Sequence, residues 1–187
     1  MAQRAADGDR QAQRELFHQL KKPVHHTLYR ILGANRDIED LIQDAFLEIF
    51  RALPSFRGDS SLNRWAQTIA TRQAFLSIEK RKPAAVDLDV VEDEIVDKDP
   101  DAHRVALARQ AAKRLYAALD RIDAKQRIAF ALAVIDGLSL AEVAEMTDSS
   151  LVAVKTRVWR ARRDLMRRAA KDPVLASYLA EFGGGDA

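Results

Sequence analysis

The sequence predicts an all-α protein made of two small helical domains joined by an acidic linker. Glycine and proline are scarce, at seven and five of 187 residues, and long segments are rich in Ala, Leu, Arg and Glu, which favour helices. Apolar residues recur in these segments at helical spacing. One strongly acidic stretch interrupts the pattern. We therefore expect helical domains at residues 1–82 and 102–172, a linker at 83–101 and a C-terminal tail at 173–187.

Composition excludes several classes of protein. There is no cysteine, so neither a disulfide nor a thiolate zinc site can form. The charged start of the chain lacks the apolar run of a signal peptide, and no stretch approaches the roughly 18 apolar residues of a membrane span. We expect a soluble, cytoplasmic protein with no membrane insertion. The four histidines (His18, His25, His26 and His103) lack metal-site spacing, and no phosphate loop or catalytic motif is present, so we expect no metal, no cofactor and no enzymatic activity.

Residues 37–53 form the first informative helix. Asp37 is expected to cap its N-terminus, and Asp40 in the first turn suits the helix dipole. The expected core side comprises Ile38, Leu41, Ile42, Ala45, Ile49 and Leu53. The outward face combines acids with an exposed leucine and comprises Asp40, Gln43, Asp44, Leu47 and Glu48. Acids repel DNA, so this face fits a protein partner better.

A loop and a second helix follow in "LPSFRGDSSLNRWAQTIATRQAFLSIEKRK". Pro54 and Gly58 indicate the loop, and Ser61 stands before the helix. The expected core stripe is Leu62, Trp65, Ala66, Ile69 and Leu76. Phe56, next to Arg57 in the loop, could stack on an unpaired base. A buried phenylalanine that closes the loop explains the same residue equally well.

Residues 83–101 are predicted to link the two domains. They contain eight acids and one base, Lys98, and Pro83 and Pro100 bracket them. No helical apolar stripe runs through them. A passive solubilising tether and a specific role in function both fit this composition.

The second domain contains the pattern of a helix-turn-helix. Ser139 and Glu142 form a capping box at the start of a short helix. "TDSS" is a turn, and Ser150 can cap the next helix. That longer helix has an expected core stripe of Leu151, Val154, Val158, Ala161 and Leu165. A short helix, a tight turn and a longer helix are typical of DNA-binding proteins.

The last helix also has a face that points away from its core stripe, and this face indicates what the helix binds. It comprises Val152, Lys155, Thr156, Trp159, Arg160 and Arg163. Between Lys155 and Lys171 there are eight basic residues and one acid, Asp164. Such side chains can reach base edges and phosphates. A basic solvated face is the alternative, but the turn before the helix favours DNA reading.

Taken together, these segments resemble the bacterial sigma factors of the sigma-70 family. "DIEDLIQDAFLEIFRALPSFRGDSSLNRWAQTIA" is similar to sigma region 2, and "GLSLAEVAEMTDSSLVAVKTRVWRARRDL" is similar to region 4. Two regions with a short linker resemble the extracytoplasmic-function (group 4) sigma factors. The pieces that carry most of the resemblance are Asp40, Gln43, Asp44 and Phe46, the "FRGDSS" loop with Trp65, and "VKTRVWRARR".

The resemblance implies that residues 1–82 dock on core RNA polymerase and open the −10 element, and that residues 102–172 read the −35 element of promoter DNA. The implied polymerase-binding residues are Asp40, Gln43, Asp44, Leu47 and Glu48. Those implied for the −10 element are Phe56, Arg57, Asp59, Ser60, Arg64 and Arg72. Those implied for the −35 element are Val152, Lys155, Thr156, Arg157, Trp159, Arg160 and Arg163. The linker would run toward the polymerase active-site cleft, and an anti-sigma factor would hold the protein inactive.

Three places in the sequence depart from the family pattern, and one of them is "RIDAKQR", which replaces the usual Leu-Pro entry to region 4. Arg72 stands where family members often have Asn, and Val152 and Ala153 replace a common Gly-Thr pair. The alternative function is a stand-alone helix-turn-helix regulator with an N-terminal sensing domain. Such a protein would need a ligand pocket within residues 1–82, and the acidic helix and the "FRGDSS" loop give no sign of one.

Overall fold

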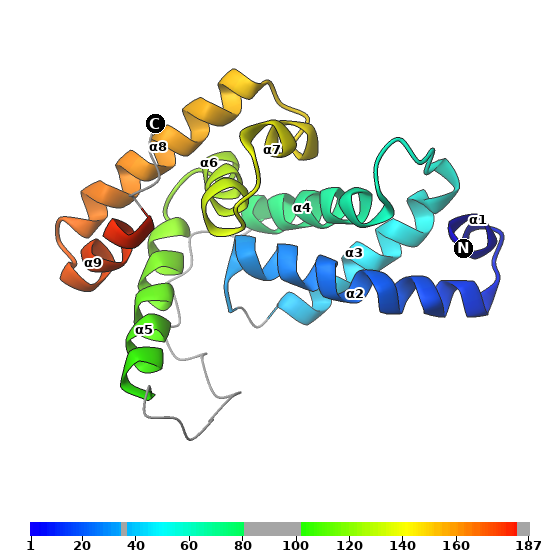
Figure 1. Ribbon diagram of the computed structural model, residues 1–187, viewed down its shortest axis with the longest axis horizontal. Helices are drawn as coiled ribbons and strands as arrows, with labels where there is room; N and C mark the ends of the chain where they lie inside the picture. The colour runs from blue at the N-terminus through cyan, green and yellow to red at the C-terminus, as the bar shows by residue number, and fades with distance from the viewer. Residues whose placement is uncertain (35–36, 81–101, 183–187) are drawn as a thin grey trace.

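The computed structural model describes residues 1–34, 37–80 and 102–182, and these are all helical or connect helices (Figure 1). The first group contains α1 (Ala2–Ala6), α2 (Arg10–Leu32), α3 (Ile38–Ala52), a 3₁₀ turn η1 (Leu53–Ser55) and α4 (Leu62–Lys80). The second contains α5 (Ala102–Leu119), α6 (Ala124–Phe130), a π-helical turn η2 (Ala131–Ile135), α7 (Leu140–Met146), α8 (Leu151–Ala169) and α9 (Pro173–Phe182). The all-α prediction is confirmed. The predicted linker, 83–101, lies outside the described residues.

Helices α2, α3 and α4 form the first layer of the core. Asp9 caps α2 by accepting hydrogen bonds from the backbone N–H groups of Gln11 and Ala12. On α3 the predicted core side is confirmed, since five of its six members are buried and Ile38 is half-buried. Asp37 does occupy the N-cap position, but its side chain makes no capping hydrogen bond. The predicted position of the N-cap is therefore confirmed, but the predicted capping hydrogen bond is not formed.

The stripe predicted for α4 was wrong at its C-terminal end. Leu76 is 41% exposed, whereas Ala66, Ala70 and Ala74 are fully buried. These alanines recur every four residues and so lie on one face of the helix. Small side chains there let α4 lie close along α2, and this contact sets the helix rotation and turns Leu76 outward.

The helix-turn-helix is formed as predicted. Ser139 and Glu142 make the capping box of α7, and the Ser150 hydroxyl accepts a hydrogen bond from the Ala153 N–H at 3.2 Å. Four members of the predicted stripe of α8 are buried, but Leu151 is 44% exposed. Leu151 is the first residue of α8, one turn before the buried Val154, and so lies beyond the edge of the packed surface.

The segment predicted to be a C-terminal tail begins with a helix, α9. Leu175 and Leu179 of α9 are buried against α5 and α8. Asp172 accepts a hydrogen bond from the Leu175 N–H at 3.2 Å and forms an ion pair with Arg114 of α5 at 2.8 Å. The second domain therefore extends to Phe182, ten residues beyond its predicted end.

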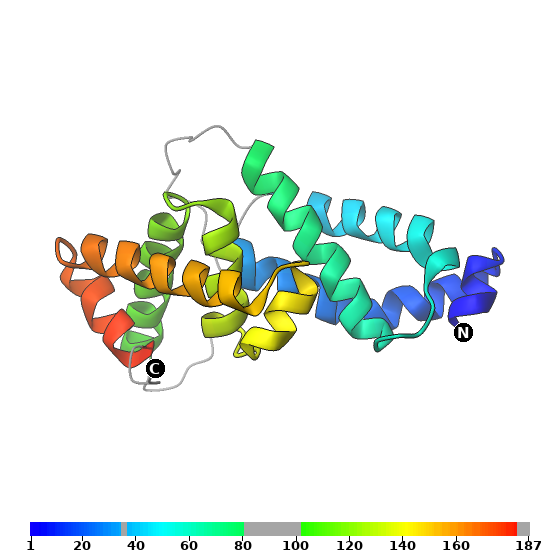
Figure 2. The same ribbon diagram turned by 90° about the horizontal axis from the view of Figure 1, so that it is seen from above.

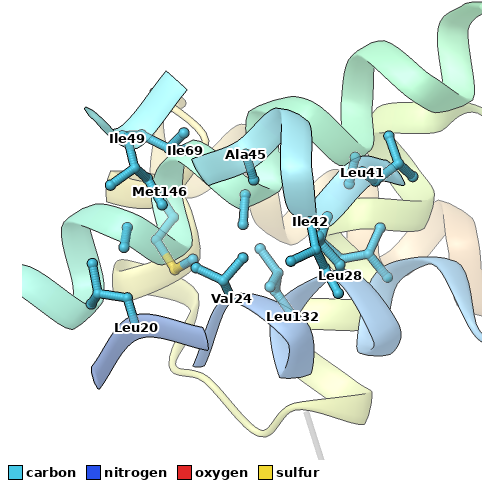
Figure 3. Close-up of a cluster of buried hydrophobic side chains, with 14 of the residues drawn as sticks. Leu20, Val24, Leu28, Leu41, Ile42, Ala45, Ile49, Ile69, Leu132 and Met146 are labelled. Atoms are coloured by element: carbon cyan, nitrogen blue, oxygen red, sulfur yellow. The ribbon is translucent and has the colours of Figure 1, made fainter. Parts of the chain in front are cut away.

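The two groups of helices pack directly against each other (Figure 2). Leu132 of η2 and Met146 of α7 are buried in the same hydrophobic cluster as Val24, Ile42 and Ile69 of the first group (Figure 3). The prediction of two domains joined by a linker included no contact between the domains. The core of the first group therefore continues into η2, α7 and the start of α8, while α5, α9 and the rest of α8 surround a second hydrophobic cluster.

No described helix is both long and apolar enough to cross a membrane.

Candidate protein-docking and nucleic-acid interfaces

The outward face of α3 is an acidic surface with an apolar centre. Asp40, Gln43 and Asp44 are exposed, Leu47 is 57% exposed, and Glu48 lies at the edge, 3.8 Å from Arg51. All five belong to the side opposite the buried stripe of α3. An exposed leucine among carboxylates suits a protein surface that carries an apolar pocket and basic residues. We call these five residues the α3 face.

A shallow pocket adjoins the α3 face. It lies between α3 and α4 and is lined by Asp37, Leu41, Asp44, Gln73, Leu76, Ser77 and Lys80. Leu76 was predicted to lie in the core, so a contribution of α4 to this surface was not predicted. The pocket extends the candidate docking surface from one helix to two.

The "FRGDSS" loop sits between η1 and α4. Phe56 is half-buried, and its ring centroid lies 5.1 Å from that of Trp65 with the ring planes tilted by 50°. Arg57 and Asp59 are exposed, Ser60 is half-buried, and Arg72 is exposed further along α4. Trp65 thus supports Phe56 from one side while part of Phe56 faces solvent. Phe56 is thus neither fully buried, as expected of a residue that only closes the loop, nor fully exposed for stacking on a base.

Arg64, a predicted −10 residue, contacts the second group of helices through its side chain. Its guanidinium forms an ion pair with Glu142 and lies 3.0 Å from the Met146 sulfur, both on α7. The Arg64 side chain is only 23% exposed. Glu142 was not predicted as a partner of Arg64 because the two residues are 78 positions apart.

The predicted reading face of α8 is open to solvent. Val152 is 72% exposed and Trp159 is 58% exposed, and Lys155, Thr156, Arg160 and Arg163 are also exposed. The Arg163 guanidinium lies 4.8 Å from the centroid of the Trp159 ring, a cation–π contact that orders both side chains. The helix thus presents donors, cations and apolar groups on one side, the set that base edges and phosphates require.

Arg157 is less exposed than the other residues predicted to contact the −35 element. It is half-buried, and its Nη1 donates a hydrogen bond to the Ser149 hydroxyl at 2.7 Å. Arg157 therefore fixes the turn before α8. The Thr156 hydroxyl donates to the Val152 carbonyl at 2.9 Å, so it can offer DNA mainly an acceptor. Asp164, the acid within the basic run, pairs with Arg167 at 3.3 Å.

The Glu142 carboxylate joins the capping box to the first group of helices. Its pKa is lowered, first because it accepts a hydrogen bond from the Ser139 backbone N–H, then by the Ser139 hydroxyl and by Arg64. A lowered pKa means that the charged form stabilises the fold. This contribution is complete above the ordinary value of 4.5 and is lost as the pH falls through the lower pKa of the folded chain.

We expect the Glu142→Gln variant to lose this pH dependence. At pH 7 the variant should melt at a lower temperature than the unmodified protein, because glutamine keeps the capping hydrogen bonds but not the charge. The difference should shrink steadily below about pH 4.5 as the native carboxylate is protonated. Melting curves followed by circular dichroism between pH 3 and pH 7 test this. A difference that stays constant across that range would contradict it.

The histidines whose side chains are described form no metal site. His26 Nε2 lies 2.9 Å from Asp136 Oδ1, and His25 stacks on Tyr29. Within the described part of the chain, no group of three or more possible metal ligands occurs.

Comparisons with known proteins agree with this geometry. Residues 16–83 match sigma-70 region 2, and residues 112–165 match sigma-70 region 4. The extracytoplasmic-function (ECF) RNA polymerase sigma-E factor of Escherichia coli is 28% identical over 170 residues, which cover 87% of this chain and 88% of that protein. The corresponding factor of Haemophilus influenzae is 27% identical and covers 87% and 89%.

Solved structures share the fold. The structure of CnrH in complex with the cytosolic domain of CnrY matches with a TM-score of 0.62 at 24% identity and covers 91% of this chain and 96% of that one. The sigma factor RpoE of Bartonella quintana, solved with the anti-sigma factor NepR, matches with a TM-score of 0.55 at 20% identity and covers 85% and 97%.

The helix-turn-helix and the preceding helical region, matched in order along the chain, define a transcription initiation factor, and the protein belongs to the sigma-70 family. Within that family it is an ECF sigma factor. It directs core RNA polymerase to promoters, opening the −10 element through region 2 and reading the −35 element through region 4. A stand-alone regulator is not favoured, because region 2 occupies the place of the sensing domain.

Proposed function

We propose that each activity belongs to one of the surfaces described above. The α3 face docks on core polymerase. The "FRGDSS" loop and α4 hold the opened −10 element, and the exposed face of α8 reads the −35 element. The observation that carries this assignment is the segregation of charge. The α3 face contributes Asp40, Asp44 and Glu48, whereas the exposed charged residues of the α8 face are basic. Only the second of these surfaces suits DNA.

The function itself is tested by reconstitution. Purified protein added to core polymerase should support runoff transcription from a subset of fragments in a promoter library, and that subset should share −10 and −35 sequences. Core polymerase alone is the control. Transcription that does not depend on the added protein would reject the role of a sigma factor, and binding to DNA without any effect on polymerase would favour a stand-alone regulator.

Further properties follow from this role. The protein contributes binding and melting while the polymerase supplies catalysis, so no catalytic group, metal or cofactor is needed. It would act in the cytoplasm, where polymerase and promoter DNA are found. We also propose an anti-sigma partner, since CnrH and RpoE were both solved as complexes, the second of them with an anti-sigma factor.

Phe56 is expected to stack on an unpaired base of the opened DNA strand. The Phe56→Ala change should slow open-complex formation more than it weakens the initial closed complex, because an aromatic platform contributes about 1–3 kcal/mol for each stacked base. Permanganate reactivity of unpaired thymines follows the opening. Trp65 would keep its place in α4, so we expect only a small change in Tm. A fall of many degrees would instead show that Phe56 is a structural residue of the loop.

A further inference from the structure

The first turn of α8 presents an apolar side chain at the end of the helix that approaches DNA. Val152 is 72% exposed, the largest exposed fraction among the large hydrophobic side chains of the described residues. In a helix-turn-helix the N-terminal residues of the second helix contact base edges in the major groove. Val152 is the second residue of α8. Its methyl groups therefore stand where the first base contacts of this helix are made.

The turn before α8 fixes the direction of this side chain. The Ser150 hydroxyl accepts a hydrogen bond from the Ala153 N–H, and Arg157 ties the helix back to the Ser149 hydroxyl. These contacts hold the first turn of α8 in place. A β-branched side chain in a helix also occupies essentially one χ1 rotamer. Val152 thus presents its methyl groups in one direction and loses little side-chain entropy when a partner covers them.

The residues around Val152 on α8 add little polarity to this end of the exposed face. Thr156 lies one turn later, and its hydroxyl donates to the Val152 carbonyl at 2.9 Å. Ala153, next to Val152, has no polar side-chain atom. The first cation of α8 is Lys155, whose charge sits at the end of a flexible four-carbon stem. The surface around Val152 is therefore apolar, and the polar base contacts of the face begin after it.

Thymine is the base that gains from such a surface. Its C5 methyl group is apolar, whereas the other groups that bases use for recognition in the major groove are hydrogen-bond donors or acceptors. A donor or acceptor placed against valine loses water without gaining a hydrogen bond, which is unfavourable. A thymine methyl group placed there is buried against other methyl groups, which is favourable. Both effects favour thymine at the base that Val152 contacts.

A second exposed apolar side chain on α8 lies too far away to read the same base. Trp159 follows Val152 by two helical turns, which is about 10 Å along the helix axis and about the length of three base pairs. The Trp159 ring is also held by the Arg163 guanidinium, 4.8 Å from the ring centroid. Val152 therefore acts on its own base pair, and its effect can be measured separately from that of Trp159.

We propose that Val152 makes the factor prefer thymine at one position of the −35 element by packing against the C5 methyl group. This inference rests on the proposed reading of the −35 element by the exposed face of α8, and it adds the chemical group that is read. Uracil offers the same hydrogen-bonding groups as thymine and lacks only the methyl group. The comparison of thymine with uracil therefore isolates the contact that Val152 makes.

Uracil substitution in the promoter tests the contact. The −35 sequence is first selected from a randomised library by holoenzyme reconstituted with the full chain, and it should contain a strongly preferred A·T pair. Each thymine of the selected element is then replaced by uracil, one at a time. At one position we expect binding of the holoenzyme to weaken about fourfold, the factor for one buried methyl group. The Val152→Ala variant should bind the thymine and uracil promoters equally well.

Three controls separate the methyl contact from general effects. Val152→Ile keeps an aliphatic side chain and should keep the sensitivity to uracil. Met166→Ala should keep it too, because it removes another exposed apolar side chain of α8 that lies about 21 Å further along the helix. Cytosine at the sensitive position should weaken binding, and 5-methylcytosine should restore part of it in the unsubstituted protein but not in Val152→Ala. Both substituted side chains are exposed, so the core stays intact in every variant.

Three outcomes would overturn the inference: no effect of uracil at any position in the unsubstituted protein, full sensitivity to uracil in Val152→Ala, or 5-methylcytosine that binds no better than cytosine. Runoff transcription from the same fragments separates these failures from a failure of the proposed function. If transcription requires the protein and uracil has no effect, only the role of Val152 is refuted. If the protein supports no transcription, the proposed function fails. The uracil substitutions are then repeated with the free full chain on duplexes that it selects, and they decide on Val152 by the same criteria.

Discussion

The double variant Asp44→Arg, Leu47→Ala is expected to lose binding to core polymerase. Leu47 is 57% exposed at the centre of the α3 face, and Asp44 is exposed beside it and lines the adjoining pocket. Truncating a central apolar residue of an interface can cost about 2 kcal/mol or more, and a reversed charge adds repulsion from basic groups on the partner. A loss of 2 kcal/mol alone corresponds to about thirtyfold weaker binding.

Binding titration with purified core polymerase measures this effect. Both side chains point away from the core, so helicity by circular dichroism and Tm should stay close to those of the unmodified protein. Glu15→Arg is a control matched in charge, because it reverses an exposed acid on α2, outside the α3 face. Undiminished binding in the double variant would remove the α3 face as the docking surface. An equal loss in Glu15→Arg would show that net charge, rather than this face, governs binding.

Substitutions on α8 are expected to separate sequence reading from general affinity for DNA. Lys155 and Arg160 are exposed on the same side of the helix as Trp159. A good bidentate hydrogen-bond pair with a base discriminates by about 1–3 kcal/mol. Lys155→Ala or Arg160→Ala should therefore relax preference at one or two −35 positions, by roughly five- to 150-fold at each position that the side chain reads.

Arg167 provides the contrast within the same helix. It is 70% exposed, lies in the last turn of α8 and pairs with Asp164. A phosphate contact adds affinity without sequence preference, and its removal flattens the dependence of binding on salt. Arg167→Ala should therefore weaken all promoters about equally. Selection of randomised −35 sequences by holoenzyme containing each variant distinguishes the two effects. If alanine at Lys155, Thr156, Trp159 and Arg160 leaves the selected motif unchanged, this face does not read DNA.

Features that depend on neighbours within one or two helical turns could be predicted from the amino-acid sequence. The capping box of Ser139 with Glu142 and the cap at Ser150 involve residues three positions apart, and helix geometry brings such residues together whatever the rest of the chain does. The buried stripe of α3 and the exposed Leu47 follow from the same period. The helical fold, the helix-turn-helix and the outward placement of both candidate surfaces could therefore be read in advance.

How the helices pack against one another depends on contacts between distant parts of the chain. The rotation of α4 depends on how closely its alanines approach α2, and so Leu76 was misplaced. Helix α9 joins the second group because Leu175 and Leu179 find a surface formed by α5 and α8. The pairing of Arg64 with Glu142, and of Arg127 with the end of α2, joins residues 78 and about 95 positions apart. No period in the sequence encodes such contacts, because they depend on the complementary shape and charge of two surfaces that exist only after each has folded.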